Sequence, residues 1–253
     1  MLYAAKSHIG LVRTMNQDGF VILPELKGYQ MYLVADGMGG PSAGDVASRL
    51  AVEEVRAYVL AHLQADSDVM EVLLAAIHAA NETIYRQASE TPAYTGMGTT
   101  VVCALADEAK VHFAHVGDSR GYLLSDGALR QVTKDHSLVA ELVRRGQLTM
   151  EEAKTHPQRN IMTRAVGTEP VSQPDIDTVD WRKGDVLLLC SDGLTNYVDD
   201  EEIAGFARRA SQCQREETLS ELVEEMIELV LTRGGSDNVT VIVGVHNEER
   251  DVI

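Results

Sequence analysis

Cysteine is scarce in this sequence, and its scarcity bears on where the protein works. The three cysteines, Cys103, Cys190 and Cys213, are odd in number, far apart and free of any CxxC pair. We therefore expect buried, reduced thiols in a reducing compartment. A secretory signal is also missing after Met1, because no basic stretch is followed by an apolar one. Together these absences predict a cytoplasmic protein.

Long apolar runs and positive charge are scarce as well. No uninterrupted apolar run approaches the roughly 18 residues of a membrane span, so we expect no membrane insertion. Lys and Arg number 22 against 39 Asp and Glu, which gives a net charge of −17. Such a surface repels phosphate backbones and anionic lipid, which argues against nucleic-acid or membrane-surface binding. An anionic substrate is still compatible with it where bound cations invert the local field.

Linkers, internal repeats and low-complexity tracts are absent too. The chain has 253 residues, 45% of them hydrophobic and 24% charged, the composition of an ordinary soluble globule. A chain of this size buries about three quarters of its unfolded surface, so it needs no disulfide or structural metal to fold. We expect one domain over residues 1–253.

The hydrophobic pattern predicts helices towards both ends of the chain and strands in the middle. Helical spacing recurs over residues 46–63 and again over residues 69–84, where Asp68 and Glu71 form a suitable cap pair. Further helices are expected at residues 138–145 and at residues 218–231, the latter stopped by Gly234 and Gly235. Runs of β-prone residues occur at residues 29–36, 99–106, 111–117, 121–124, 186–190 and 239–245, the last with alternating character.

These elements do not follow one another as strand, helix, strand. Their order predicts an α+β fold in which antiparallel sheets are covered by helices. Short polar connections in the middle of the chain indicate antiparallel meanders of consecutive strands. Residues 146–174 are polar and lack a sustained period, so we expect a mobile flap there.

Four aspartates stand at the ends of predicted strands. Asp36, Asp118 and Asp192 each end an apolar run, and Asp237 opens the last one. Asp next to Gly is good turn chemistry, which accounts for any one of them alone. The ends of several strands in packed sheets can instead converge on one cleft, where carboxylates repel one another unless a cation neutralises them.

The ligands on offer are oxygens, which favours a hard cation. Mg²⁺ or Mn²⁺ suits oxygen donors best, whereas zinc prefers His or Cys. Gly37 is small enough for its carbonyl to approach such an ion. Arg13 precedes the first apolar run, and its guanidinium can hold a phosphate by two parallel hydrogen bonds or simply pair with a surface acid. Metal ions beside an arginine indicate phosphoryl transfer to water, with a metal-bridged hydroxide attacking in line.

The same stretches resemble the metal-dependent protein phosphatase family of the 2C type, in its compact bacterial form. Six blocks match in the family's order and spacing, from about residue 3 to about residue 245. They are Arg13-x-x-Asn16-Gln17-Asp18, Asp36-Gly37-Met38-Gly39-Gly40, Gly96-Met97-Gly98-Thr99-Thr100, Gly117-Asp118-Ser119-Arg120, Ser191-Asp192-Gly193-Leu194 and Gly235-Ser236-Asp237-Asn238. One Asp-Gly pair is a weak signal, but six ordered blocks are a strong one.

The resemblance implies a four-layer αββα sandwich, with two central antiparallel sheets flanked by helices on both outer faces. It also implies a serine/threonine phosphatase that hydrolyses phosphoserine and phosphothreonine in proteins with Mn²⁺ or Mg²⁺. Its partners would be phosphorylated proteins, including a cognate Ser/Thr kinase and the targets of that kinase. We expect a monomer that binds no nucleic acid.

The resemblance assigns roles to the acids. Asp36, Asp192 and Asp237 would hold the first metal ion. Asp36 and the Gly37 carbonyl would hold the second ion, and Asp18 would act through the water of that ion.

A third, weaker ion is found in bacterial members of the family. Asp118 and Asp192 would hold it here. Arg13 would bind the substrate phosphate, so the resemblance assigns catalysis to Arg13, Asp36 and Asp192.

Two positions depart from the larger relatives in the family. Those relatives often have a His, proposed as general acid, where this chain has Met38, and they tend to have Glu where this chain has Gln17. The proton for the leaving alkoxide must then come from metal-bound water or another group. His136 and His156 are the histidines to consider, although a structural hydrogen bond is the simpler role for each.

Other readings fit less well. A cysteine phosphatase needs an Arg six residues after its thiolate, and those positions hold Ala109, Asn196 and Leu219. The run Asp175-Ile176-Asp177 is similar to the paired-aspartate motif of haloacid-dehalogenase-type phosphatases, but a polar stretch precedes it, so we expect an exposed edge segment. A non-enzymatic regulatory module of the same fold is the alternative, and manganese-dependent hydrolysis of an aryl phosphate separates it from an enzyme.

Overall fold

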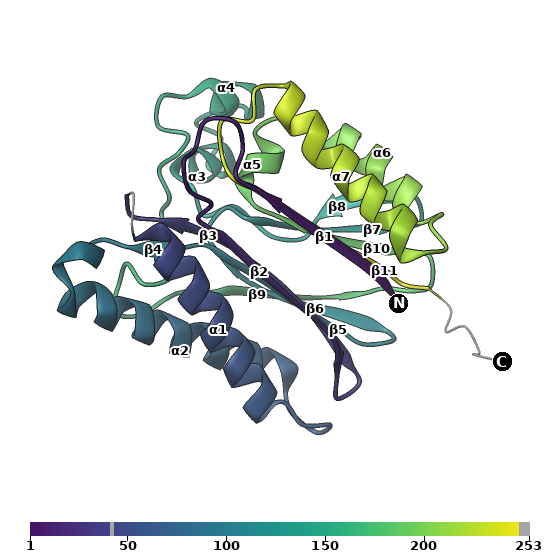
Figure 1. Ribbon diagram of the computed structural model, residues 1–253, viewed down its shortest axis with the longest axis horizontal. Coiled ribbons are helices and arrows are strands. Elements are labelled where there is room, and N and C mark those ends of the chain that lie inside the picture. The colour runs from purple at the N-terminus through teal and green to yellow at the C-terminus, as the bar shows by residue number, and fades with distance from the viewer. Residues whose placement is uncertain (41–42, 248–253) are drawn as a thin grey trace.

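Two antiparallel β-sheets stack face to face at the centre of the molecule (Figure 1). The computed structural model describes residues 1–40 and 43–247. In order across the first sheet, the strands are β1 (Leu2–His8), β11 (Val239–Val245), β10 (Val186–Cys190), β7 (Arg120–Ser125) and β8 (Ala128–Gln131). In order across the second sheet they are β2 (Asp18–Leu26), β3 (Tyr29–Met38), β5 (Val101–Ala106), β6 (Lys110–Val116) and β9 (Asp175–Asp180), with β4 (Gly98–Thr99) paired to the end of β3.

A pair of long helices covers the outer face of each sheet (Figure 1). The helices α1 (Gly44–His62) and α2 (Val69–Glu90) pack on the second sheet, and α6 (Asp200–Ala210) and α7 (Glu216–Thr232) pack on the first. The shorter helices are η1 (Pro92–Tyr94), α3 (Leu138–Arg144), α4 (Met150–Thr155) and α5 (Asp192–Thr195). Within the described residues, no helix is long and apolar enough to cross a membrane.

Three apolar cores join these four layers of secondary structure. Between the sheets, Tyr32 and Phe113 of the second sheet share a core with Leu187 and Ile242 of the first, and all four are almost completely buried. The other two cores lie between each sheet and its helices. Burial of apolar surface is the main favourable term in folding, so these cores hold the layers together. The predicted αββα sandwich is confirmed.

The helices expected from hydrophobic spacing are present as α1, α2, α3 and α7. Asp68 caps α2, because its carboxylate accepts hydrogen bonds from the backbone N–H groups of Met70 and Glu71. The three cysteines are buried and free, as expected.

The strands in the middle of the chain do not form one continuous meander. β5 and β6 pair as neighbours, but β7 pairs with β10 in the other sheet. The chain crosses between the sheets at Gly117, which has a φ of +108° and lies so close to Thr100 that a Cβ would come within 2.6 Å of its side chain. The predicted meander is wrong at this point, because an apolar run marks a strand but does not identify its partner.

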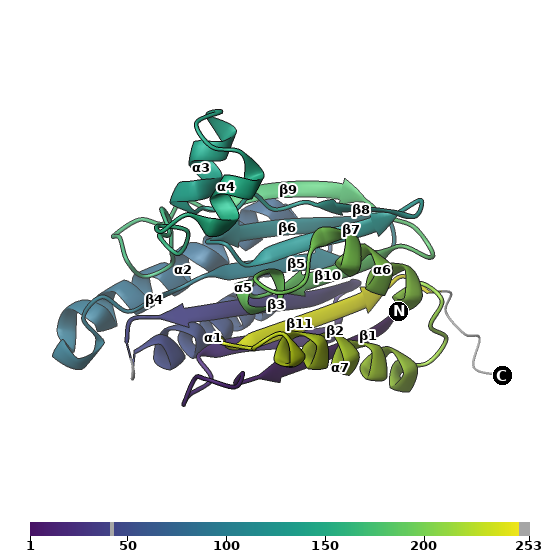
Figure 2. The ribbon, with the colours of Figure 1, turned by 90° about the horizontal axis from the view of Figure 1, so that it is seen from above.

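The polar segment 146–174 contains more regular structure than expected. Helix α4 begins behind a capping box, in which the side chains of Thr149 and Glu152 each accept a hydrogen bond from the backbone N–H of the other residue. Figure 2 shows α4 beside α3 at one end of the sheets. The expectation of an aperiodic segment is therefore wrong for α4, which is too short to produce a visible helical period.

The last strand, β11, is buried along its whole length. It lies between β1 and β10, with α7 on one face of its sheet and the second sheet on the other. The predicted alternation is wrong here, because a strand that is covered on both faces needs apolar side chains on both.

Candidate functional site

Five aspartates from both sheets gather at one end of the sandwich. Asp18 opens β2 and pairs directly with Asp36 on β3. Asp118 follows β6, Asp192 follows β10, and Asp237 precedes β11. Asp36 lies close enough to the other four to feel the charge of each. The structure thus brings together the predicted strand-end acids, and Asp18 joins them.

Burial and mutual repulsion raise the pKa values of four buried members of this aspartate cluster, Asp18, Asp36, Asp118 and Asp192. For Asp36, burial is the larger cause and the charges of Asp18 and Asp192 add to it, so its pKa lies well above the ordinary value. For Asp192, burial and then the charge of Asp237 raise the pKa, while hydrogen bonds with Asn196 and Asp36 oppose them. Carboxylates held this close cannot all ionise at neutral pH unless a cation neutralises them.

Asp18 has one oxygen with partners and one without. Its Oδ2 accepts hydrogen bonds from Ser191 Oγ at 2.8 Å and from Thr240 Oγ1 at 2.6 Å. Its Oδ1 is buried and meets no donor among the described residues. Burial raises the pKa of Asp18 to about 7, although the two hydroxyl groups act to lower it. A buried carboxylate oxygen without a donor is costly, and a nearby cation would relieve that cost.

Arg13 joins the aspartate cluster through Asp237. Its Nη2 donates a hydrogen bond to Asp237 Oδ2 at 2.8 Å, and its side chain is 51% exposed. This hydrogen bond is the main cause that raises the pKa of Arg13, and partial burial opposes it. Arg13 therefore lies at the exposed edge of the cluster, paired with an acid that is itself a predicted metal ligand.

Asn238 orders the loop that carries Arg13. Its Nδ2 donates hydrogen bonds to the carbonyl oxygens of Ile9 at 2.8 Å and Met15 at 3.0 Å. Its Oδ1 accepts a hydrogen bond from the backbone N–H of Gln17 at 2.8 Å. Asn238 is buried, so these bonds fix the loop on both sides of Arg13. The sequence alone indicated no role for Asn238, although this residue belongs to one of the matched blocks.

Gly37 allows the end of β3 to touch the start of α1. A Cβ at position 37 would lie 1.9 Å from the carbonyl oxygen of Gly44. The Gly37 N–H donates to the carbonyl of Gln17, and the Gln17 side chain donates to the carbonyl of Gly40. Gln17 thus supports this turn as a neutral side-chain donor. Met38 follows, and its thioether has no proton to donate.

Asp118 lies in the crossing between the two sheets. Burial raises its pKa to about 7, and the charges of Asp192 and Asp135 add to this effect. Of these two, Asp192 has the larger influence and is the residue with which Asp118 is predicted to share an ion.

The two histidines considered as proton donors have structural partners. The Nδ1 of His136, which is buried, accepts a hydrogen bond from the Gly117 N–H at 3.1 Å. His156 ends α4, and its Nδ1 accepts a hydrogen bond from the Gln158 N–H at 3.2 Å. Both bonds fit the simpler, structural role.

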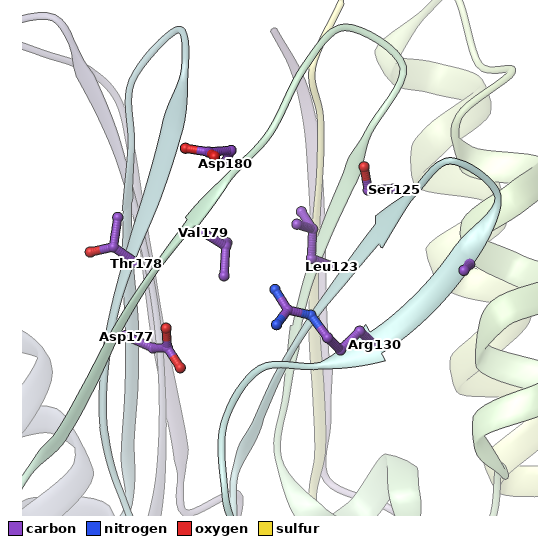
Figure 3. A pocket seen from close by; sticks show the side chains of 8 residues that line it. Leu123, Ser125, Arg130, Asp177, Thr178, Val179 and Asp180 are labelled. Atoms are coloured by element: carbon purple, nitrogen blue, oxygen red, sulfur yellow. The ribbon is translucent and has the colours of Figure 1, made fainter.

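A groove of about 510 Å³ opens between the edge strands of the two sheets. Residues of β7 and β8 line one side and residues of β9 the other, with Arg130 across from Asp177 (Figure 3). None of the predicted site residues lines this groove. β9 itself is an edge strand, antiparallel to β6, so it is not the buried parallel strand that a paired-aspartate phosphatase needs at Asp175.

Comparisons with known proteins agree with one another. A sequence model of the family described as protein phosphatase 2C matches residues 6–228. The serine/threonine phosphatase stp of Listeria monocytogenes is 40% identical over 236 residues, which cover 92% of this chain and 91% of that protein. The crystal structure of the Mycobacterium tuberculosis serine/threonine phosphatase PstP/Ppp has a TM-score of 0.85 at 40% identity, covering 97% of this chain and 98% of that one. The catalytic domain of PstP in complex with two manganese ions has a TM-score of 0.83 at 38% identity, covering 97% and 98%.

Proposed function

The chain belongs to the protein phosphatase 2C family, and on this premise we propose that it hydrolyses phosphoserine and phosphothreonine in proteins. The observation that carries the proposal is the gathering of aspartates from both sheets around Asp36. Such a cluster does not stabilise the fold by itself, because its members repel one another. The cluster can bind a substrate once cations lie between the carboxylates, because the cations attract an anionic phosphate.

The oxygen donors of the aspartate cluster suit Mn²⁺ or Mg²⁺, and the relative PstP has been crystallised with two manganese ions. When bound, such ions neutralise the carboxylates and activate the water that attacks phosphorus in line. Asp36, Asp192 and Asp237 would hold the first ion, and Asp36 and the Gly37 carbonyl the second. Asp18 would act through the water of the second ion, and its Oδ1, which meets no donor among the described residues, is the oxygen free to do so.

Arg13 is the residue that we propose for binding the substrate phosphate. One of its N–H groups donates to Asp237, and the guanidinium has further donors for phosphate oxygens. Its exposed position lets a phosphate on a protein surface reach it without rearrangement of the core.

The flap and Asp118 belong to the same proposal. We propose one catalytic domain over residues 1–253, of which 41–42 and 248–253 lie outside the described residues, with a flap at residues 146–174. Asp118 and Asp192 would share a third, weaker ion beside this flap. The coupling of their charges supports this assignment.

The substrates are phosphorylated proteins, and we propose that a cognate Ser/Thr kinase and its targets are among them. We also propose a monomer in the cytoplasm, the compartment in which three free cysteines stay reduced. The net charge of −17 argues against nucleic acid as a partner.

The test is hydrolysis of an aryl phosphate and of a phosphothreonine-containing protein by the purified full chain. We expect turnover of both substrates to require Mn²⁺ and to be lost on chelation. Asp36→Asn keeps the size of the side chain and removes its charge, so it should lower kcat by about 100-fold or more. Glu53→Gln, on the exposed face of α1, is the matched control and should have no effect. A protein that binds Mn²⁺ but turns over neither substrate would be the non-enzymatic module of this fold.

A further inference from the structure

The loop that carries Arg13 exposes three large apolar side chains to solvent. Nine large apolar residues are exposed in the described part of the chain, and Leu11, Val12 and Met15 are three of them. Leu11 is 63% exposed, Val12 66% and Met15 41%, whereas the other six are spread over residues 20–176. A single exposed apolar residue needs no explanation, but a group of them marks a surface that binds something. We call Leu11, Val12 and Met15 the apolar loop residues.

The backbone of this loop is fixed although its side chains are exposed. The Leu11 N–H donates a hydrogen bond to the Gly235 carbonyl at 2.7 Å. Gly10 has a φ of +83°, and a Cβ there would lie 2.2 Å from the carbonyl oxygen of Asp237, so the loop lies directly against the segment before β11. Asn238 bonds the backbone on either side, as described above. A fixed backbone presents the apolar loop residues to a ligand without first having to be ordered, which lowers the entropic cost of binding.

The apolar loop residues lie within reach of a substrate whose phosphate is bound by Arg13. Two residues of chain span at most about 7 Å, so the Cα atoms of Leu11 and Met15 are no farther than this from the Cα of Arg13. In a substrate polypeptide, the residues within two positions of the phosphorylated one lie within the same distance of it. Binding of the phosphate therefore brings the residues that flank it to the apolar loop residues.

The charges of the loop favour an apolar flanking residue over an acidic one. In the sequence of residues 9–17, Arg13 is the only charged side chain, and Asp237 already accepts a hydrogen bond from it. The net charge of −17 adds a general repulsion of acidic segments. An apolar flanking side chain, in contrast, gains free energy when it covers Leu11 or Val12, because both surfaces leave water.

We propose that Leu11, Val12 and Met15 form a subsite that selects phosphoproteins with apolar residues beside the phosphorylated one. The occupant is the substrate segment itself, since the subsite is continuous with the residue proposed to bind the phosphate. This inference rests on the proposed phosphatase function and names the class of sequence on which that function acts: a phosphoserine or phosphothreonine with an aliphatic residue within two positions of it.

The first experiment measures kcat/KM at saturating Mn²⁺ for two phosphothreonine peptides. One peptide has Leu at the two positions on each side of the phosphothreonine, and the other has Ser there. We expect the unmodified chain to prefer the Leu peptide at least about fivefold, from the apolar surface that is covered. Leu11→Gln keeps the approximate size of the side chain and should reduce the preference to about twofold or less. Leu11→Met, which stays apolar, should retain it.

Two further variants guard against an indirect effect of Leu11→Gln. Val12→Thr keeps the branched shape and exchanges a methyl group for a hydroxyl, so it should also reduce the preference. Leu60→Gln is the matched control, because Leu60 is an exposed leucine on α1. It lies 16 residues after Gly44, the residue that contacts the site, which corresponds to about 24 Å along the helix. The preference should be unchanged in this control.

Three outcomes of this experiment would overturn the proposal. They are equal kcat/KM values for the two peptides in the unmodified chain, a preference that survives both Leu11→Gln and Val12→Thr, and a preference that Leu60→Gln removes as well. A second copy of the chain is the other occupant to test, by sedimentation. If the unmodified chain formed a dimer that Leu11→Gln dissociated, the apolar loop residues would be an interface between copies and the subsite would be wrong.

The second experiment separates this inference from the proposed function, because it needs no turnover. Calorimetry with Mn²⁺ gives the Kd of the same two peptides when each contains a non-hydrolysable phosphonate in place of the phosphate. We expect the Leu peptide to bind at least about fivefold more tightly, and Leu11→Gln to remove most of this difference. If the chain hydrolysed neither phosphopeptide, the proposed function would fail while the two Kd values still decided whether the subsite exists. If it hydrolysed both peptides equally and bound both phosphonates equally, the subsite alone would be wrong.

Discussion

At the scale of single residues, the surroundings of Asp18 show most clearly why the aspartate cluster needs a bound cation. Its neighbours satisfy one carboxylate oxygen and leave the other buried without a donor among the described residues. Folding therefore raises its pKa from 3.8 to about 7. A buried carboxylate of this kind lowers the stability of the metal-free fold. Binding of a cation to the same carboxylate can offset that loss.

Metal-free protein should lose stability through Asp18 as the pH rises from about 4 to about 7. Because the pKa of Asp18 is raised in the folded state, the unfolded chain releases this proton at a lower pH than the folded chain does. The stability that Asp18 contributes is therefore complete below about pH 4 and is lost as the pH passes about 7. Asp18→Asn removes this titration. The free energy of unfolding of both proteins is measured by urea unfolding with EDTA. We expect the variant to become more stable relative to the unmodified chain by on the order of 1–3 kcal/mol as the pH rises over this interval. A difference that is constant with pH would contradict the raised pKa.

Arg13 allows a prediction that separates phosphate binding from metal binding. Arg13→Ala should lower kcat/KM for an aryl phosphate about 10- to 100-fold, because a charge-assisted contact to phosphate is lost from a half-exposed site. Mn²⁺ affinity, measured by calorimetry, should stay equal or become tighter, since Arg13 competes with a cation for Asp237. Weaker Mn²⁺ binding would show that Arg13 serves to order the cluster.

At the scale of secondary-structure elements, close backbone packing fixes where the acids lie. The end of β3 touches the start of α1 at Gly37, where an added Cβ would lie 1.9 Å from the Gly44 oxygen. A similar contact occurs at Gly193, where a Cβ would lie 1.9 Å from the Asn238 oxygen. Each glycine directly follows a cluster aspartate, so these contacts set the position of the carboxylate before it.

Gly37→Ala should therefore destabilise the protein by at least about 2 kcal/mol, because backbone atoms must move to admit the methyl group. Gly205→Ala, on α6, is the control: its Cβ meets no atom within 4 Å, so the change should stabilise the helix by up to about 1 kcal/mol. Both values come from urea unfolding of metal-free protein. If Gly37→Ala were as stable as the unmodified chain, the contact between β3 and α1 would not be tight.

Elements were predictable from the sequence where burial imposes a pattern. β10 and the middle of β3 are apolar runs because both of their faces are covered, and the acids that follow these runs, Asp36 and Asp192, could be identified from position alone. β2 is an edge strand with exposed positions, so its sequence has a weaker pattern, and Asp18 was identified only through the family resemblance. The crossing at Gly117 could not be predicted, because pairing depends on contacts that are distant in the sequence.

The supporting polar residues of the site were equally hard to predict. Ser191, just after β10, and Thr240, on β11, hold Asp18 from the other sheet, at sequence separations of 173 and 222 residues. Nothing in the local sequence distinguishes such hydroxyl groups from those that serve turns or solvent. Their role follows only from the stacking of the two sheets.

At the scale of the whole molecule, the aspartate cluster lies between the two sheets. The second sheet supplies Asp18 and Asp36, and the first sheet contributes Asp192 and Asp237 at the ends of β10 and β11. Without a cation, repulsion between these carboxylates acts to separate the sheets at this end. A bound cation reverses the sign of that interaction, because it attracts carboxylates from both sheets.

Mn²⁺ should therefore raise the stability of the whole fold as well as its activity. Ligand linkage gives about 2.7 kcal/mol when free Mn²⁺ is 100 times its Kd, and each kcal/mol shifts the Tm by roughly 2–4 °C in a chain of this size. We expect calorimetry to show one unfolding transition that moves up with Mn²⁺ concentration and returns to its starting Tm with excess EDTA. Asp36→Asn should raise the Tm of metal-free protein, because repulsion is relieved, and should reduce the shift produced by Mn²⁺. A full Mn²⁺ shift in Asp36→Asn would place the ion elsewhere, since the charges of all four other cluster carboxylates act on Asp36.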